Sequence, residues 1–361
     1  MTKAQNNDVM SSKNPKTEIA KLIRKNVRDM KPYSSARDEF QGEADVFMDA
    51  NENPYPSPYN RYPDPLQLKV KEKLSLIKGI EPARIFLGNG SDEAIDLLIR
   101  AFCEPHEDSI LITEPTYGMY AVCANVNAVN LKTISLDKNF DLNIDAFPDL
   151  GDSRLKLIFL CSPNNPTGNL MSRDRIIFLL ENFQGLVVVD EAYIDFTESK
   201  SFLTELDKYP NLAVLQTFSK AWGLAGLRLG MCFASKEIIA ILNKIKYPYN
   251  VNISTQELAL QALDNVEKTR SWVQEIILER ERLSKSLAAL PLTEMVYPTE
   301  ANFLLVKVEN APTIYQRLME QGIIVRDRSN VQLCAGCLRI TVGTPHENHR
   351  LVNALRKMST R

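Results

Sequence analysis

With 361 residues, the chain is long enough for about two domains with apolar cores of their own. A net charge of -2 and a pI near 6.1 exclude the basic surface that nucleic-acid binding requires, and no apolar run approaches the roughly 20 residues of a membrane span. Residues 1–16 are polar and lack the apolar stretch of a secretory signal, so we expect a disordered leader on a cytoplasmic protein with reduced cysteines.

Residues 17–60 are expected to form an N-terminal arm. Residues 17–27 have the spacing of an amphipathic helix, whereas residues 49–65 are rich in proline and too irregular for a helix or a strand. An irregular stretch of this length indicates an arm or a site loop. Because the helix of the arm has no core of its own, we expect the arm to pack on the smaller of the two domains.

From residue 61 to about residue 255, strand patterns alternate with helix patterns. The strand-like runs are continuously apolar and cover residues 85–87, 109–113, 155–161, 186–189 and 213–217. Continuous apolar runs are typical of strands buried on both faces, which predicts a large α/β domain with a mostly parallel sheet covered by helices. Residues 256–361 combine charged helices with short strands, which predicts a smaller α+β domain.

Polar side chains follow these strands, at the edge where open α/β sheets bind ligands. They are Gly90, Ser91 and Asp92 after the first strand, Tyr117 after the second, Asn165 after the third, Asp190 and Tyr193 after the fourth, and Thr217, Ser219, Lys220 and Arg228 around the fifth. Singly, several have ordinary explanations: the glycine run suits a simple turn, and the two tyrosines suit half-buried aromatic side chains. Their convergence at one edge of the predicted sheet is stronger evidence for a ligand site than any single residue.

The combined groups describe a site for pyridoxal 5'-phosphate. A lysine amine captures a carbonyl, a carboxylate keeps a pyridine nitrogen protonated, and a helix N-terminus with hydroxyls and an arginine holds a phosphate. The three histidines lie away from this edge, which argues against a histidine-based triad. Cys334 and Cys337 have a redox or zinc spacing, but a single pair without partner histidines favours free thiols and no metal.

Three runs resemble the class II aminotransferases of pyridoxal-phosphate fold type I: residues 162–168 (Ser-Pro-Asn-Asn-Pro-Thr-Gly), 190–193 (Asp-Glu-Ala-Tyr) and 219–221 (Ser-Lys-Ala). A narrower likeness to the histidinol-phosphate aminotransferases rests on residues 26–33, 50–54, 60–64, 224–228 and 337–343. The resemblance extends from about residue 20 to the end of the chain. It implies the fold of that family, with a large cofactor-binding domain and a small C-terminal domain.

The resemblance also implies a role for each cofactor-binding residue. Lys220 would bind the cofactor as a covalent internal aldimine, Asp190 would pair with the pyridinium nitrogen, and Tyr117 would stack on the ring. Asn165 and Tyr193 would hydrogen-bond the phenolic oxygen of the ring. The groups that would hold the phosphate are the amides of Gly90, Ser91 and Asp92, with Thr217, Ser219, Arg228 and, from the neighbouring subunit of a homodimer with shared active sites, Tyr62. The Asp92 carboxylate should point away from the phosphate or cap the helix.

Substrate binding is implied for Tyr33, Asn53, Asn165, Arg326 and Arg339. Two guanidiniums suit a dianion through several charge-assisted hydrogen bonds, although Arg326 alone is equally explained as a surface charge beside Asp327 and Arg328. The expected reaction is transamination of L-histidinol phosphate with 2-oxoglutarate, giving imidazole-acetol phosphate and glutamate in histidine biosynthesis. An aromatic-amino-acid aminotransferase and a threonine-phosphate decarboxylase are alternatives on the same scaffold. A non-catalytic regulator would carry a DNA-binding domain or lack the lysine.

Overall fold

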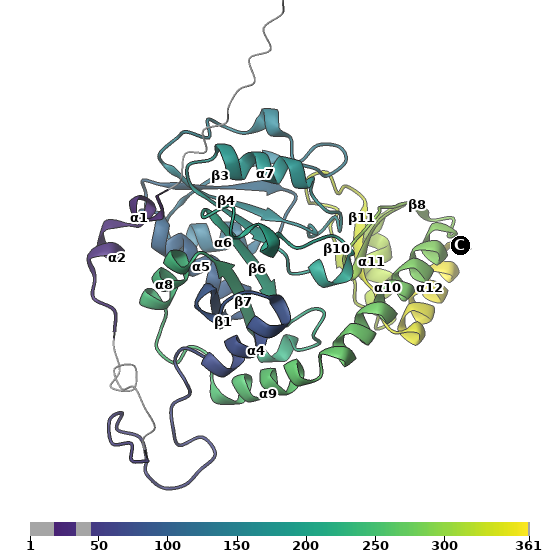
Figure 1. Cartoon of the computed structure of the whole chain (residues 1–361). Coiled ribbons are helices and arrows are strands. Elements are labelled where there is room, and N and C mark those ends of the chain that lie inside the picture. Colours follow the sequence, from purple (N-terminus) through teal and green to yellow (C-terminus); the bar gives the residue numbers. More distant parts are fainter. Residues whose placement is uncertain (1–17, 34–44, 360–361) are drawn as a thin grey trace, which may run out of the picture.

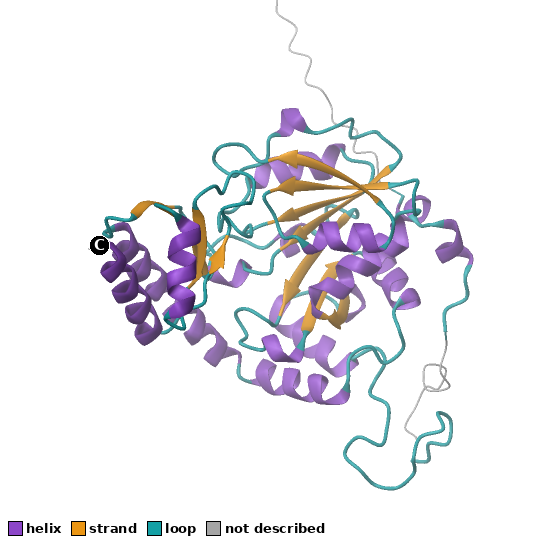
Figure 2. Cartoon of the chain, turned by 180° about the vertical axis from the view of Figure 1, so that it is seen from behind, coloured by secondary structure: helices purple, strands orange, loops and turns teal. Residues whose placement is uncertain are grey.

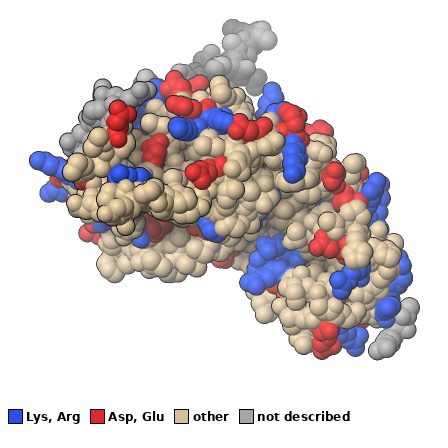
Figure 3. All heavy atoms as spheres, turned by 90° about the horizontal axis from the view of Figure 1, so that it is seen from below, with Lys and Arg blue, Asp and Glu red and all other residues tan. Residues whose placement is uncertain are grey.

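The computed structural model of the chain describes residues 18–33 and 45–359 (Figure 1). The expected leader lies outside the described residues. Within them, no helix combines the length and the apolar character that crossing a membrane requires. Lys, Arg, Asp and Glu are interspersed over the face drawn in Figure 3, where a furrow separates a larger lobe from a smaller one.

A seven-stranded sheet forms the centre of the larger lobe, in the order β1-β7-β6-β5-β4-β2-β3. The strands are β1 (Ile85–Asn89), β2 (Ser109–Glu114), β3 (Asn130–Ser135), β4 (Leu155–Cys161), β5 (Leu186–Asp190), β6 (Leu212–Thr217) and β7 (Leu229–Ala234). Among these strands, β7 runs in the direction opposite to the other six. The mostly parallel sheet predicted from the sequence is therefore confirmed.

Both faces of this sheet are buried, as the continuous apolar runs predict. Successive residues of β4 alternate between two core clusters, with Leu157 and Phe159 in one and Ile158 and Leu160 in the other. The cluster of Leu157 includes residues of α5 (Gly90–Phe102), α6 (Met119–Val126) and α8 (Lys236–Ile245). The opposite cluster includes residues of α4 (Leu68–Lys78), α7 (Arg173–Asn182) and α9 (Ile253–Asp264).

The smaller lobe is built on an antiparallel sheet in the order β10-β11-β9-β8. Its strands are β8 (Thr293–Val296), β9 (Phe303–Val308), β10 (Arg326–Asp327) and β11 (Cys337–Thr341). Helices α10 (Val266–Ala288), α11 (Ala311–Glu320) and α12 (Pro345–Ser359) share an apolar cluster with this sheet. In Figure 2 the small sheet lies between these helices and the larger lobe. The predicted α+β domain is confirmed.

The expectation that the N-terminal arm packs on the small domain is wrong for its described helices. Helices α1 (Ile19–Leu22) and α2 (Lys25–Asp29) bury Ile19 and Val27 in the core cluster of α5 and α8. The Arg24 amide donates to the Ala101 carbonyl at 3.0 Å. This contact, at the C-terminal end of α5, lies where the single helix expected over residues 17–27 is interrupted.

Helix α9 also differs from the domain boundary expected after residue 255. Ala259 and Leu263 lie in the core cluster of the large sheet, together with Val70 and Leu74 of α4. The helical periodicity identified an apolar face on residues 256–263, but it carried no information about which sheet that face would cover.

Candidate active site

A cavity of about 670 Å³ lies at the carboxyl edge of the large sheet and reaches the small sheet. Thirteen of the residues that the sequence singled out line it: Gly90, Ser91, Asp92, Tyr117, Asn165, Asp190, Tyr193, Thr217, Ser219, Lys220, Arg228, Arg326 and Arg339. The parallel strands β4, β5 and β6 end at this edge, whereas the antiparallel β7 begins there, directly after Arg228. The topology thus gathers an amine, a carboxylate and a guanidinium around one space.

Lys220 follows β6 and faces the cavity. Its Nζ lies 5.7 Å from the centroid of the Tyr193 ring. Removal of water from the amine lowers the pKa of Lys220, and the positive charge of Arg339 lowers it further, while the negative charge of Asp190 opposes both effects. A lowered pKa increases the fraction of neutral amine, which is the nucleophilic form.

Asp190 ends β5 as a buried carboxylate that is 2% exposed. Its Oδ1 accepts from the Ala192 amide at 3.1 Å, and its Oδ2 accepts from the Tyr120 hydroxyl at 2.7 Å. Burial raises the pKa of Asp190 to about 6, although both hydrogen bonds lower it. The carboxylate is therefore ionised at neutral pH and held in one orientation, suitable for a cationic partner in the cavity.

Tyr120 is a site residue that the sequence reasoning missed. Its ring is fully buried and stacks on Phe159, with centroids 5.0 Å apart. Burial raises the pKa of Tyr120 well above its usual value, so the hydroxyl remains a hydrogen-bond donor to Asp190. The available signal was its position three residues after Tyr117. Tyr117 precedes α6 and Tyr120 lies in its first turn, and the two rings meet edge to face with centroids 5.6 Å apart.

The start of α5 and the turn before β7 form an anion cradle. The Arg228 Nη1 lies 3.4 Å from the Ser219 Oγ. Arg228 itself has a left-handed φ of 52°, and its carbonyl accepts from the Gly90 amide at 2.6 Å. A Cβ on Gly230 would lie 2.0 Å from the Ser91 amide nitrogen, so only glycine lets the two segments approach this closely. The amides of Ser91 and Asp92 belong to the first turn of α5, where no intrahelical acceptor exists.

Two expectations for this cradle are corrected by its hydrogen bonds. The Gly90 amide bonds the Arg228 carbonyl, so it fixes the turn and is not directed at a phosphate. The Asp92 carboxylate does not point away, because its Oδ2 lies 3.4 Å from the Arg228 Nη2 and its Oδ1 accepts from the Tyr117 hydroxyl at 3.1 Å. The positive end of the helix and the guanidinium both attract this carboxylate.

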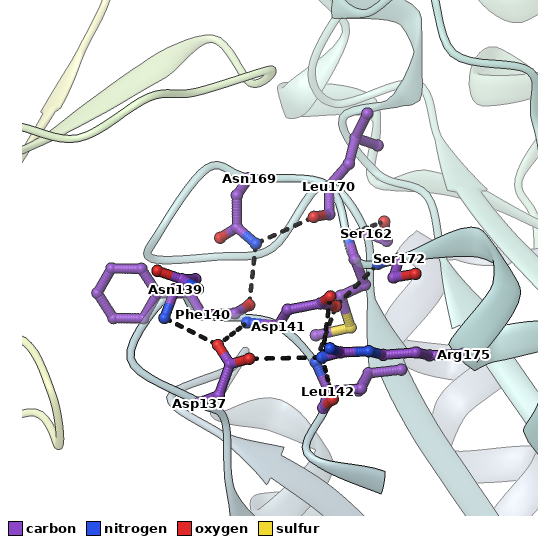
Figure 4. Close-up of polar contacts among 11 residues, drawn as sticks. Asp137, Asn139, Phe140, Asp141, Leu142, Ser162, Asn169, Leu170, Ser172 and Arg175 are labelled. Carbon is purple, nitrogen blue, oxygen red and sulfur yellow. Dashed lines mark hydrogen bonds and ion pairs between the residues drawn. The ribbon is translucent and has the colours of Figure 1, made fainter.

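Polar contacts join the loop after β4, residues 162–172, to residues 137–142, as Figure 4 shows. The Asn169 side-chain amide donates to the Phe140 carbonyl at 2.9 Å, and the Ser172 amide donates to Asp141 Oδ1 at 2.8 Å. Arg175 pairs with Asp141 at 3.1 Å. These contacts tie the loop after β4 to residues 137–142 and so fix the position of Asn165.

The small sheet contributes arginines to the cavity. Arg339 on β11 donates from Nη1 to the Asn165 Oδ1 at 2.5 Å, which links the two lobes at the site. Arg326 on β10 is directly opposite Arg339 in the strand pairing. A third arginine, Arg328, lines the same cavity, although the sequence analysis assigned it no role.

Three expected site residues do not line the cavity of their own chain. Tyr33 is 70% exposed on the arm. Asn53 accepts from the Tyr55 amide at 3.0 Å, and Tyr62 stacks on Tyr249 with centroids 4.5 Å apart. Within a single chain, therefore, none of the described residues of the arm lines the cavity.

The donor set fits pyridoxal 5'-phosphate. The anion cradle matches a phosphate group, Asp190 matches a pyridinium nitrogen, and Lys220 matches an aldehyde carbon. All six cysteines are free and buried, and burial raises the pKa of the Cys334 thiol to about 12 and that of Cys337 to about 11. The expected free thiols are confirmed, and these two are protonated at neutral pH.

Comparison with known proteins gives consistent results. Residues 41–355 match the family model described as "Aminotransferase class I and II". The histidinol-phosphate aminotransferase of Parabacteroides distasonis is 59% identical over 94% of this chain and 99% of that protein. The crystal structure of the histidinol-phosphate aminotransferase from Clostridium acetobutylicum superposes with a TM-score of 0.76 at 26% identity, covering 83% of this chain and 91% of that one. The Sinorhizobium meliloti enzyme, described in complex with pyridoxal-5'-phosphate, shares the fold with a TM-score of 0.75 at 24% identity, covering 83% of each chain.

Proposed function

Because the chain belongs to the class I and II aminotransferases, and within them to the histidinol-phosphate aminotransferases, we propose that it transfers the amino group of L-histidinol phosphate to 2-oxoglutarate with pyridoxal 5'-phosphate as cofactor. The products are imidazole-acetol phosphate and glutamate, in histidine biosynthesis. The observation that carries the proposal is the single cavity that joins Lys220 and Asp190 to an anion cradle and to arginines of the small sheet.

When bound, the cofactor supplies an aldehyde for condensation with amines and a protonated ring that accepts an electron pair from a substrate carbon. Asp190, ionised above about pH 6, supplies the negative charge that keeps a ring nitrogen protonated, and Tyr120 fixes its orientation. The amides of Ser91 and Asp92, with Ser219 and Arg228, hold the phosphate.

Lys220 has two tasks in this proposal. Its amine holds the cofactor covalently, and its lowered pKa favours the neutral form needed for that bond. When substrate frees the amine, Nζ is the base positioned to move a proton from the amino-bearing carbon of the substrate. Tyr117 lies at the cavity wall with its hydroxyl directed to Asp92, which suits a ring that covers one face of the cofactor.

Arg339 and Arg326 are the proposed ligands for the anionic end of the substrate, with Asn165 and Tyr193 beside them. A phosphate dianion can accept charge-assisted hydrogen bonds from both guanidiniums. Glutamate and 2-oxoglutarate present a carboxylate to the same groups, so one site serves both halves of the reaction.

We also propose a homodimer in which the arm completes the partner's site. Large aromatic side chains on and near the arm are exposed: Tyr55 (77%), Tyr59 (64%), Tyr62 (50%) and Tyr247 (76%). Tyr59 and Tyr62 line a hollow of about 710 Å³, together with Pro248 and Tyr249. Exposed apolar patches of this kind mark protein interfaces. Tyr33, Asn53 and Tyr62 would then act on the neighbouring subunit.

The location and the domain limits remain proposals of the same kind. Six free, buried cysteines support a reducing compartment, and we propose the cytoplasm. The helix packing supports a large cofactor-binding domain that begins near residue 61 and includes α9, followed by a small domain that begins with α10.

The proposed reaction is tested by adding L-histidinol phosphate to the purified holoenzyme. The absorbance spectrum of the bound cofactor should change and be restored by 2-oxoglutarate, and Lys220→Ala should show neither change. Turnover of L-phenylalanine at an equal or higher kcat/KM would instead identify an aromatic aminotransferase. Carbon dioxide released from threonine phosphate would identify a decarboxylase.

Shared active sites are tested by mixing two inactive variants, Lys220→Ala and Tyr62→Ala, at limiting cofactor. If each site uses Tyr62 of the partner subunit, random reassortment restores about a quarter of the wild-type activity, because one site of each mixed dimer is intact. Activity that does not exceed the mean of the two parents would contradict sharing.

A further inference from the structure

Arg328 is a guanidinium in the cavity that neither the motif nor the proposed mechanism uses. It lines the cavity with Arg326 and Arg339, and its side chain is half-buried. Burial lowers the pKa of Arg328, and the neighbouring charges of Arg339 and Arg326 lower it further. Three cations thus share one space.

The strand register explains why all three point to the same side. Arg326 is directly opposite Arg339 in the pairing of β10 with β11. The Arg328 amide donates to the Cys337 carbonyl at 2.9 Å, so the pairing continues for two more residues. Because side chains two apart on a strand share a face, Arg328 emerges on the face of Arg326.

Placing these three cations on one face is energetically unfavourable without a bound anion. Like charges directly opposite each other destabilise a sheet. None of the carboxylates within residues 18–33 and 45–359 forms an ion pair with Arg326, Arg328 or Arg339. The neighbouring Asp327 instead accepts from the Ser329 amide and hydroxyl, at 2.8 and 2.6 Å.

The Arg328 guanidinium also has an unused donor. Its Nε is buried without a hydrogen-bond partner among the described residues. An unpaired buried donor is unfavourable, and for a charged group more so. Arg339, by contrast, already donates to Asn165. Arg328 is therefore a half-buried cation with no side-chain acceptor among the described residues, at the wall of a cavity that an anion can enter.

We propose that Arg328 binds the phosphate of the amino donor together with Arg326, and so sets the preference for phosphorylated donors over their unphosphorylated counterparts. The inference rests on the proposed function. A phosphate dianion has three oxygens and two charges, which suits a third guanidinium, whereas a carboxylate has two oxygens and one charge.

The test compares L-histidinol phosphate with L-histidinol, which differ only in the phosphate. Arg328→Gln should lower kcat/KM for L-histidinol phosphate about 10- to 100-fold, the size expected for a lost hydrogen bond to a charged group, chiefly through KM. It should leave kcat/KM for L-histidinol within about threefold, and weaken inhibition of the holoenzyme by inorganic phosphate. Arg328→Lys, which keeps a point charge, should fall between the glutamine variant and the wild type.

Arg317→Gln serves as the matched control, because Arg317 is an exposed arginine on α11 of the same lobe, outside the cavity. Equal losses for both donors, or an unchanged ratio between them, would overturn the role of Arg328. If the glutamine variant lost its cofactor spectrum, the lysine variant would decide by the same ratio. Failure of the wild type to use L-histidinol phosphate would instead refute the proposed reaction.

Discussion

Replacing Asp190 by asparagine isolates the cost of a buried negative charge in the cofactor-free protein. The carboxyl has a pKa of 3.8 when exposed and about 6 when folded. Between these values the folded state binds more protons than the unfolded state, so its stability falls as the pH rises. At about 1.36 kcal/mol per unit of pKa, the full loss is about 3 kcal/mol, of which roughly half lies between pH 5 and pH 7.5.

The assay is urea unfolding of the cofactor-free wild type and Asp190→Asn at pH 5 and pH 7.5, at one fixed protein concentration. The free energy of unfolding of the wild type should fall by about 1 kcal/mol more than that of the variant. Any constant effect of the substitution on the hydrogen bonds of Tyr120 and Ala192 cancels in this comparison. Bound cofactor should shrink the difference, because a protonated ring nitrogen compensates the charge. Equal losses in the two cofactor-free proteins would refute the argument.

Other variants test the supports of the site. Tyr120→Phe removes the donor to Asp190, and we expect the dissociation constant of the cofactor, measured by absorbance titration, to rise about 10- to 100-fold; an unchanged constant would contradict the role of this hydrogen bond. Gly230→Ala places a Cβ 2.0 Å from the Ser91 amide, so its melting temperature should drop by several degrees and depend less on added cofactor, whereas Gly226→Ala, with open space around it, should melt like the wild type. Arg326→Ala should weaken L-histidinol phosphate far more than an aromatic amino acid, and equal losses in kcat/KM would remove its proposed role.

Much of the large domain follows from two properties of the sequence. Continuous apolar runs such as residues 155–161 predicted strands with both faces buried, and Leu157 and Ile158 do face opposite clusters. The rule that ligands lie at the carboxyl edge then placed Asp190 and Lys220 in one cavity. The first prediction needs only the local sequence pattern, and the second needs only the direction of the strands.

The predictions that were wrong or missing concern contacts between segments that lie far apart in the sequence. Nothing near Ile19 in the sequence indicates that α8 would cover it, and the apolar face of α9 fits either sheet until α4 is in place. Tyr120 lies in α6, and its bond to Asp190 at the end of β5 depends on how α6 packs on the large sheet. The sequence analysis gave Arg328 no role, since its place in the cavity depends on a register with β11 that no local pattern specifies.

The anion cradle and the three cavity arginines, Arg326, Arg328 and Arg339, belong to different parts of the structure. The cradle is formed by the start of α5 and the turn before β7, where Gly230 tolerates no side chain, whereas Arg326 and Arg339 lie on strands of the small sheet and Arg328 directly follows β10. The small sheet has an apolar cluster of its own. Mutations at Arg326 and Arg328 can therefore redirect the enzyme to a donor of different charge without touching the groups that hold the cofactor phosphate, whereas Arg339 also contacts Asn165. Such a division allows new specificities to evolve one residue at a time within an otherwise unchanged catalyst.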